Sequence, residues 1–209
     1  MLRKEPCERF LAQATLISVT DNLPGRITEP KALRALSHPT RWAIVDLLRL
    51  EQTVTATRCA EVIGESVASC SYHLGMLAKY GFVEQAEGGQ GREKPWKLSQ
   101  QRQSWSLDGM DTEGQLAVET LSEVYLDHTV AQMKEYVRRS GREPDEWRQS
   151  AGSWGTLGYL SADELAALAA EFAAICDRYT ARIEDPSLRP EGARPVRIFL
   201  TTWLPRPPS

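Results

Sequence analysis

Hydroxyl, imidazole and amine side chains recur along the segment from Val67 to Tyr80, whose apolar residues follow the spacing of a helix. Because successive helical residues are rotated by about 100°, Ser69 and Tyr72 lie opposite the apolar stripe, in the N-terminal half of the helix. Hydroxyl groups in this position can hydrogen-bond to base edges in the major groove of DNA. Lys79, at the far end, is placed to contact a phosphate. The residues that we expect to contact DNA from this segment are Ser66, Ala68, Ser69, Ser71, Tyr72, His73, Met76 and Lys79.

A second group of candidate DNA-binding residues follows that helix. Arg92 and Lys94 lie beside the glycine-rich stretch 88–91, between two short β-type runs, Phe82–Glu84 and Trp96–Leu98. Two such runs separated by a glycine-rich loop predict a β-hairpin. A basic hairpin tip can follow the DNA backbone or enter a minor groove.

Short helices are expected to position both groups. Pro30 opens a helix that runs to Leu36, and Pro39 suits the first position of the next. A third helix is expected over 56–63, where Gly64 ends it in a left-handed conformation, and Ser66 can cap the helix that follows. The elements therefore follow the order of a winged helix-turn-helix module: two helices, a short helix, a tight turn, another helix and a hairpin.

The second half of the chain begins with a long helix, expected over roughly 114–139. A row of residues recurs along it at alternating steps of four and three, as in a short coiled-coil seam suited to pairing with a second copy. Further on, Ser161 and Glu164 form the pattern of a capping box, and strands are expected near 154–159 and from Val196 to Trp203. The predicted dimer seam consists of Ala117, Leu121, Val124, His128 and Ala131.

The predicted fold class is therefore mainly α with small β elements. It comprises an N-terminal extension (1–25), a winged helix-turn-helix domain (26–107), and a region (108–209) with the dimerisation helix and a C-terminal α/β appendage. Residues 26–107 carry 11 Lys and Arg against 8 Asp and Glu, a net charge of +3, and residues 108–209 carry 11 against 17, a net charge of −6. A mildly basic DNA-binding half joined to an acidic half is expected when only one face meets phosphate.

Composition restricts the class of protein. With 42% hydrophobic and 25% charged residues the chain resembles an ordinary globular protein. No apolar run is long enough to span a membrane, and polar residues interrupt any signal-peptide core near the N-terminus, so a cytoplasmic location without a membrane partner is expected.

Three segments resemble the ArsR/SmtB family of bacterial winged-helix repressors: LSHPTRWAIVDLL, SVASCSYHLGMLAKYGFVE and GREKPWKLS. The resemblance spans about 70 residues. It implies a homodimer that occupies a pseudo-palindromic operator in double-stranded DNA and leaves it when an effector binds. In that family the residue directly before the His-Leu pair of this helix is often Arg, whereas in this chain Tyr72 stands before His73 and Leu74. This departure removes the usual bidentate guanine donor and leaves the operator sequence open.

The metal-sensing features of that family are missing. The place of its Cys-x-Cys pair holds Thr55, Ala56 and Thr57, and the adjacent Asp127 and His128 point about 100° apart on a helix. No metal or other cofactor is therefore predicted. An oxidisable Cys176 remains one alternative for sensing. Another is a small apolar or aromatic ligand bound among C-terminal aromatic residues, which otherwise fill a small core and an interface: Trp147, Trp154, Tyr159, Phe172, Tyr179, Phe199 and Trp203.

The sequence gives no support to one other class of function and leaves a second open. An enzyme built on a winged helix needs a nucleotide-binding unit, and the residues after the hairpin contain neither a GxGxxG nor a P-loop motif, so no catalytic residue is predicted. A winged-helix module that binds proteins and no longer reads DNA stays open, because the DNA-binding half carries a net charge of only +3.

Overall fold

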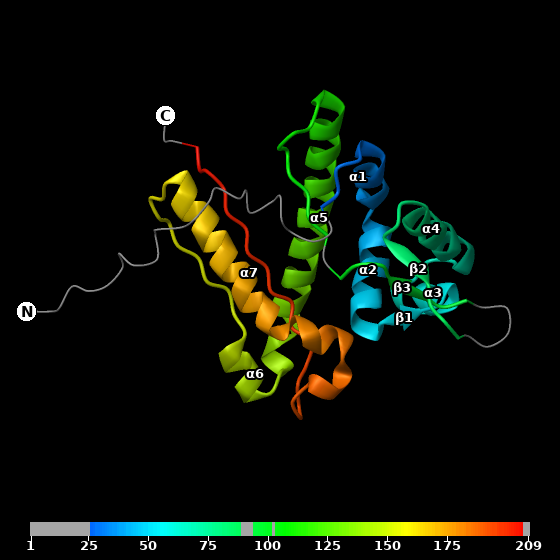
Figure 1. The fold of residues 1–209 in the computed structure, drawn as a ribbon. Coiled ribbons are helices and arrows are strands. Elements are labelled where there is room, and N and C mark those ends of the chain that lie inside the picture. Colours follow the sequence, from blue (N-terminus) through cyan, green and yellow to red (C-terminus); the bar gives the residue numbers. More distant parts are fainter. Residues whose placement is uncertain (1–25, 89–93, 102, 207–209) are drawn as a thin grey trace, which may run out of the picture.

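The structure is a computed structural model that describes residues 26–88, 94–101 and 103–206 of the 209-residue chain (Figure 1). It confirms the mainly α fold with small β elements. The elements are α1 (Pro30–Leu36), α2 (Pro39–Glu51), β1 (Thr53–Val54), α3 (Ala56–Ile63), α4 (Val67–Lys79), β2 (Val83–Gln85), β3 (Trp96–Leu98), α5 (Thr112–Arg139), η1 (Ser140–Arg142), α6 (Asp145–Ser150), α7 (Ala162–Glu184) and η2 (Pro186–Leu188).

Side-chain caps fix the boundaries of the two short helices α3 and α4. The Thr55 hydroxyl accepts a hydrogen bond from the Arg58 amide at 3.2 Å, and the Ser66 hydroxyl accepts one from the Ser69 amide at 3.1 Å. Between the helices, Gly64 adopts φ +82°, a left-handed conformation that favours glycine. The tight turn predicted between 63 and 67 is confirmed.

The three short strands form an antiparallel sheet in the order β1-β3-β2. Val83 pairs with Leu98, and Thr53 pairs with Lys97. The predicted hairpin is therefore confirmed, with its first strand one residue later than expected, and β1 adds a third strand beside the returning one.

The hydrophobic core lies among α1, α2, α4, the sheet and the first half of α5. Trp42 is central to it, with its ring centroid 4.7 Å from that of Tyr125 and 5.9 Å from that of Trp105. The indole Nε1 of Trp105 donates to the Ser122 hydroxyl at 2.9 Å. The largest fully buried core residues besides Trp42 include Leu33, Leu36, Ile44, Leu48, Leu74, Leu77 and Leu121.

The face of α5 predicted as a dimer seam lies against the same chain. Ala117 and Leu121 are buried in the core, and Val124 packs against that core. The imidazole Nε2 of His128 lies 2.7 Å from the Asp46 carboxylate on α2, and Ala131 is exposed. Four of the five seam residues thus have partners within the chain, because a 3-4 apolar spacing shows that a helix face is covered without saying which element covers it.

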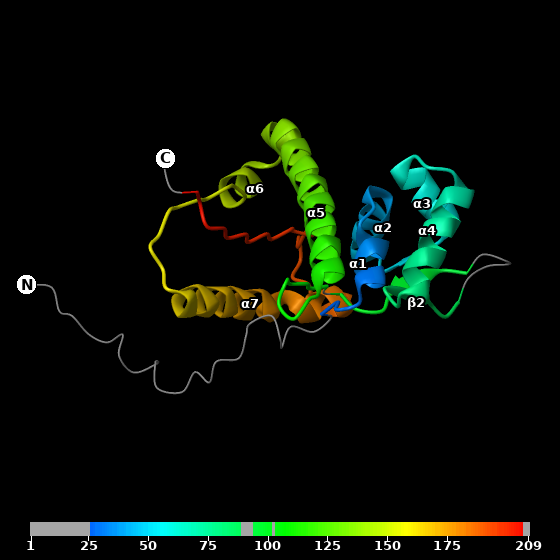
Figure 2. The same cartoon turned by 90° about the horizontal axis from the view of Figure 1, so that it is seen from above.

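The C-terminal region differs from its prediction as well. The capping box of α7 is present, with Ser161 and Glu164 each accepting the other's backbone N–H. No strand forms in the described residues after β3, so the strands expected at 154–159 and 196–203 are absent. Among the described residues, no ladder of backbone hydrogen bonds joins either run to a neighbouring segment, and such a ladder is what defines a strand. The region contains only helices and extended segments, most of it separated from α1–α4 by α5 (Figures 1 and 2).

Among the described residues, no helix is both long and apolar enough to cross a lipid bilayer.

Candidate nucleic-acid interface

Helix α4 presents two chemically different faces. Cys70, Leu74 and Leu77 are buried against the core, which fixes the orientation of the helix. On the opposite face Tyr72 is 61% exposed, and Ser69 and Met76 are partly exposed. Four further residues that are predicted to contact DNA are exposed: Ser66, Ala68, Ser71 and Lys79. The outer face therefore presents mostly small and polar side chains, together with Tyr72 and Met76.

His73 is the exception among the predicted contacts in this helix. Its side chain is only 7% exposed, and its Nδ1 accepts a hydrogen bond from Arg41 Nε at 3.3 Å. Its ring centroid lies 4.5 Å from that of His38. His73 points inward because it is adjacent to Leu74 on the buried side, so in the described conformation its side chain faces the core and not the outer face of α4.

The hairpin formed by β2 and β3 lies beside α4. Lys94 is exposed at the edge of the hairpin loop, and Arg92 lies outside the described residues. On the hairpin itself, Lys97 Nζ lies 3.1 Å from a Glu84 carboxylate oxygen, both side chains being about half exposed. Of the two predicted basic tip residues, the structure thus places Lys94 at the surface.

A family model described as a helix-turn-helix domain matches residues 36–86, from the end of α1 to the residue after β2. Residues 36–86 form a helix-turn-helix domain. The match includes both α3 and α4 and the turn between them, which are the elements that DNA-binding helix-turn-helix domains use to contact DNA. No curated protein matches the chain.

Arg41 and two histidines hold α4 of the helix-turn-helix domain against α1 and α2. Besides His73, the guanidinium of Arg41 donates to the Ala35 carbonyl at the end of α1. His38 caps α2, because its Nδ1 accepts from the Thr40 amide at 3.2 Å. Burial, followed by nearby positive charge, lowers the pKa of both histidines, so each imidazole is held in the neutral form that can accept these hydrogen bonds.

This neutral pair predicts a loss of stability in mild acid. A base whose pKa is lowered by folding takes up protons more readily when unfolded, so the free energy of unfolding falls as the pH drops below the ordinary histidine value of about 6.5. We expect the midpoint of urea unfolding to decrease from pH 8 to pH 5. His73→Gln keeps an acceptor but cannot protonate, and it should flatten part of that decrease. An equally steep decrease in the variant would contradict the assignment.

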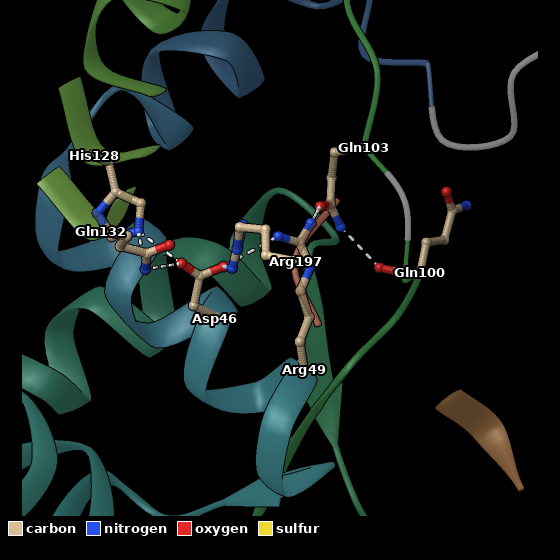
Figure 3. Close-up of polar contacts among 7 residues, drawn as sticks. All are labelled: Asp46, Arg49, Gln100, Gln103, His128, Gln132 and Arg197. Carbon is tan, nitrogen blue, oxygen red and sulfur yellow. Dashed lines mark hydrogen bonds and ion pairs between the residues drawn. The ribbon is translucent and has the colours of Figure 1, made fainter. Parts of the chain in front are cut away.

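A polar cluster joins the helix-turn-helix domain to α5 and to the C-terminal segment (Figure 3). At its centre Asp46, on α2, accepts hydrogen bonds from Gln132 Nε2 at 2.7 Å and from the Arg197 guanidinium. His128 Nε2 is 2.7 Å from the same carboxylate, and Arg49 lies 3.2 Å from it. One carboxylate thus links residues up to 151 positions apart in sequence.

The environment of Asp46 keeps its carboxylate ionised. Burial alone would raise its pKa, but the hydrogen bond from His128 and the positive charges of Arg197 and Arg49 outweigh burial and hold the pKa well below its ordinary value. The cluster extends outward, since Arg49 donates to Gln103 at 2.6 Å and Gln103 donates to the Gln100 carbonyl at 2.8 Å. Sequence reasoning missed this site. Its only signal was an acidic residue inside the apolar run of α2.

The cysteines of the helix-turn-helix domain are poorly suited to bind a metal. Cys59 and Cys70 are both buried, and burial raises the pKa of the Cys59 thiol to about 12. A soft metal needs the thiolate, which this environment disfavours. Cys176, the alternative redox residue, is a free, partly exposed thiol on α7.

The C-terminal aromatic residues do not line an enclosed pocket in the single chain. Trp154 is 89% exposed and Tyr159 is 100% exposed, while Phe199 packs near Tyr125 with ring centroids 6.1 Å apart. Trp147 lies beneath the Arg194 guanidinium at 4.9 Å. These residues are spread over separate segments of the chain.

Proposed function

We propose that this protein is a homodimeric transcriptional regulator that binds a specific DNA sequence and acts as a repressor. The outer face of α4 carries the proposal. Tyr72 and Ser71 project from a helix whose inner face is fixed by the core, and the helix follows α3 after a three-residue turn. Two such helices in a dimer would fit half-sites about 34 Å apart on a pseudo-palindromic operator.

The proposed interface divides into base-reading and backbone-contacting residues. Ser69, Ser71 and Tyr72 are proposed to read bases near the start of α4. Lys79, Lys94 and Arg92 are proposed to contact phosphates, and the free N–H groups at Ser66 add to them. Ala68 and Met76 contribute close apolar contact with the groove. An enzymatic activity is not part of this proposal.

A non-metal effector is proposed to release the protein from DNA. The protonated state of the Cys59 thiol disfavours a thiolate metal site in this domain. The link from Arg197 through Asp46 to α2 offers a route by which a change in the C-terminal region reaches α4, because α2 packs against α4. A small apolar or aromatic molecule is the proposed effector class.

Selection of bound duplexes from a random pool, at low and high salt, tests the proposal. We expect an inverted repeat to be enriched, and affinity to fall steeply with salt because phosphate contacts release counterions. Failure to bind any duplex at micromolar protein and low salt would contradict DNA binding and favour a winged-helix module that binds proteins.

Tyr72→Ala and Lys79→Ala should separate base reading from phosphate contact. Loss of the Tyr72 contact should cost about 1–3 kcal/mol of discrimination between the selected site and a scrambled one. Lys79→Ala should weaken binding to both duplexes equally and reduce the salt dependence by about one counterion. Fluorescence anisotropy on the two duplexes measures both effects. If Tyr72→Ala retains the wild-type discrimination, α4 is not the base-reading element.

A further inference from the structure

The side of α5 that faces away from α1 and α2 carries an unpartnered apolar stripe. Its residues recur at steps of four and three, and the most open of them, Val137, is 67% exposed. An open hollow of about 440 Å³ lies on this stripe, and its rim includes Lys134 and Arg138. The apolar residues of the stripe are Leu126, Val130, Met133 and Val137. We call this surface the α5 stripe.

Helix α7 carries a second stripe with the same spacing. Leu168, Ile175 and Tyr179 are each between 42% and 48% exposed. Beyond Thr129, none of the side chains that the structure describes is buried. A long amphipathic helix gains most of its stability by covering its apolar face, so this face requires a partner. The residues of this α7 stripe are Leu165, Leu168, Phe172, Ile175 and Tyr179.

The charged residues beside the two stripes have the same order along each helix, with acidic residues toward the N-terminal end and basic residues toward the C-terminal end. On α5, Glu119 and Glu123 continue the stripe toward its N-terminal end, while the rim near its C-terminal end is basic. On α7, the charged residues that flank the stripe are likewise acidic toward the N-terminal end, at Glu164 and Glu171, and basic toward the C-terminal end, at Arg178 and Arg182, while Asp177 lies on the opposite face. Antiparallel packing of α7 on α5 therefore places opposite charges beside each other at both ends.

The chain's own α7 does not fill this place. It runs at a steep angle to α5 in both views (Figures 1 and 2), and the α5 stripe remains exposed. The segment after α7 is fastened elsewhere, because Arg194 lies 2.9 Å from the Glu143 carboxylate and Arg197 pairs with Asp46. A helix from another molecule of the same sequence has the matching apolar spacing and charge order.

We propose that α7 of one copy packs antiparallel along the α5 stripe of a second copy, with the reciprocal contact completing a two-fold dimer. Both contacts are identical in such an arrangement: α7 of each copy covers the α5 stripe of the other copy, so both stripes of both copies are covered. This inference rests on the dimer in the proposed function and specifies its surfaces, which are not those of the seam predicted from sequence.

Charge reversal tests the contact with two variants. The first, Lys134→Glu with Arg138→Glu, makes the α5 rim acidic, and the second, Glu171→Lys, makes the facing part of α7 basic. Each variant alone brings like charges together, so sedimentation velocity should show at least about tenfold weaker dimerisation than wild type. Mixing the two should restore a dimer, because in the heterodimer both contacts again join opposite charges.

The control and the remaining outcomes separate this proposal from the proposed function. Leu50→Glu changes an exposed apolar residue on α2, outside both stripes, and should leave dimerisation unchanged. Single variants that dimerise as wild type does, or a mixture that forms no heterodimer, would overturn this contact while leaving dimerisation by another surface intact. A wild-type chain that is monomeric up to high micromolar concentration would overturn both the contact and the dimer. DNA binding is measured separately by anisotropy of the monomeric variant on a half-site duplex.

Discussion

Replacing Asp46 with alanine should be among the most destabilising single changes in this protein. The carboxylate is the shared partner of Arg197, Arg49, His128 and Gln132, and its removal leaves partly buried cations without their counter-charge. Removing one member of a buried ionic network typically costs about 3–5 kcal/mol. Because Arg197 is 35% exposed and Arg49 is 25% exposed, we expect the lower end, about 3 kcal/mol. Urea unfolding followed by tryptophan fluorescence measures the change.

A double-mutant cycle with Arg197→Ala tests whether the link to the C-terminal segment is part of that loss. If the Asp46–Arg197 contact contributes, the double variant is less destabilised than the sum of the single variants. Additive effects would mean that the C-terminal segment is not held by Asp46. Glu87→Ala, an exposed carboxylate on the hairpin, is the matched control and should change stability by less than about 0.5 kcal/mol.

Because folding lowers the pKa of Asp46, the pH range in which this carboxylate stabilises the folded protein is also determined. A carboxyl group whose pKa is lowered by folding stabilises the protein above its ordinary value near 3.9, and that contribution is lost as the pH falls further. The contribution of the His38–His73 pair is lost at a higher pH. The two groups can therefore be distinguished in one pH series.

Local features of the helix-turn-helix domain could be predicted from sequence because local chemistry determines them. Pro39 at a helix start, Gly64 at a helix end and Ser66 as a cap act through backbone geometry and nearby amides. The alternation of buried Cys70, Leu74 and Leu77 with exposed Tyr72 also follows from helical periodicity.

Features that depend on distant contacts could not be predicted in the same way. The residues Ala117 and Leu121 are apolar and correctly spaced for a seam, yet they lie in the core that α5 shares with α1 and α2, and the spacing alone does not indicate which helices cover them. His73 faces inward because Arg41 and His38, from other elements, provide its partners. Arg197, one of the partners of Asp46, lies 151 residues away in the chain, and no local pattern indicates that pairing.

Trp42→Ala should have the other large effect, because Trp42 joins the helix-turn-helix domain to α5. Its side chain is 1% exposed, and its ring packs against Trp105 and Tyr125. Truncating a fully buried tryptophan typically costs about 3–5 kcal/mol, from lost apolar burial and from the cavity left behind. Thermal unfolding by circular dichroism, together with DNA affinity at a temperature where the variant is folded, measures the consequences for stability and for the interface.

The matched control for Trp42→Ala is Trp154→Ala, which removes the same side chain from an exposed loop position and should change stability by less than about 0.5 kcal/mol. Equal effects of the two substitutions would contradict the position of Trp42 in the core. The DNA affinity of the Trp42→Ala variant shows whether the cluster of Trp42, Trp105 and Tyr125 only stabilises the fold or also positions α4. If the folded Trp42→Ala variant binds the selected operator as wild type does, the cluster only stabilises the fold. If its affinity falls while α4 remains helical, the packing of α5 on α2 sets the position of α4, and a change at α5 can then be transmitted to DNA.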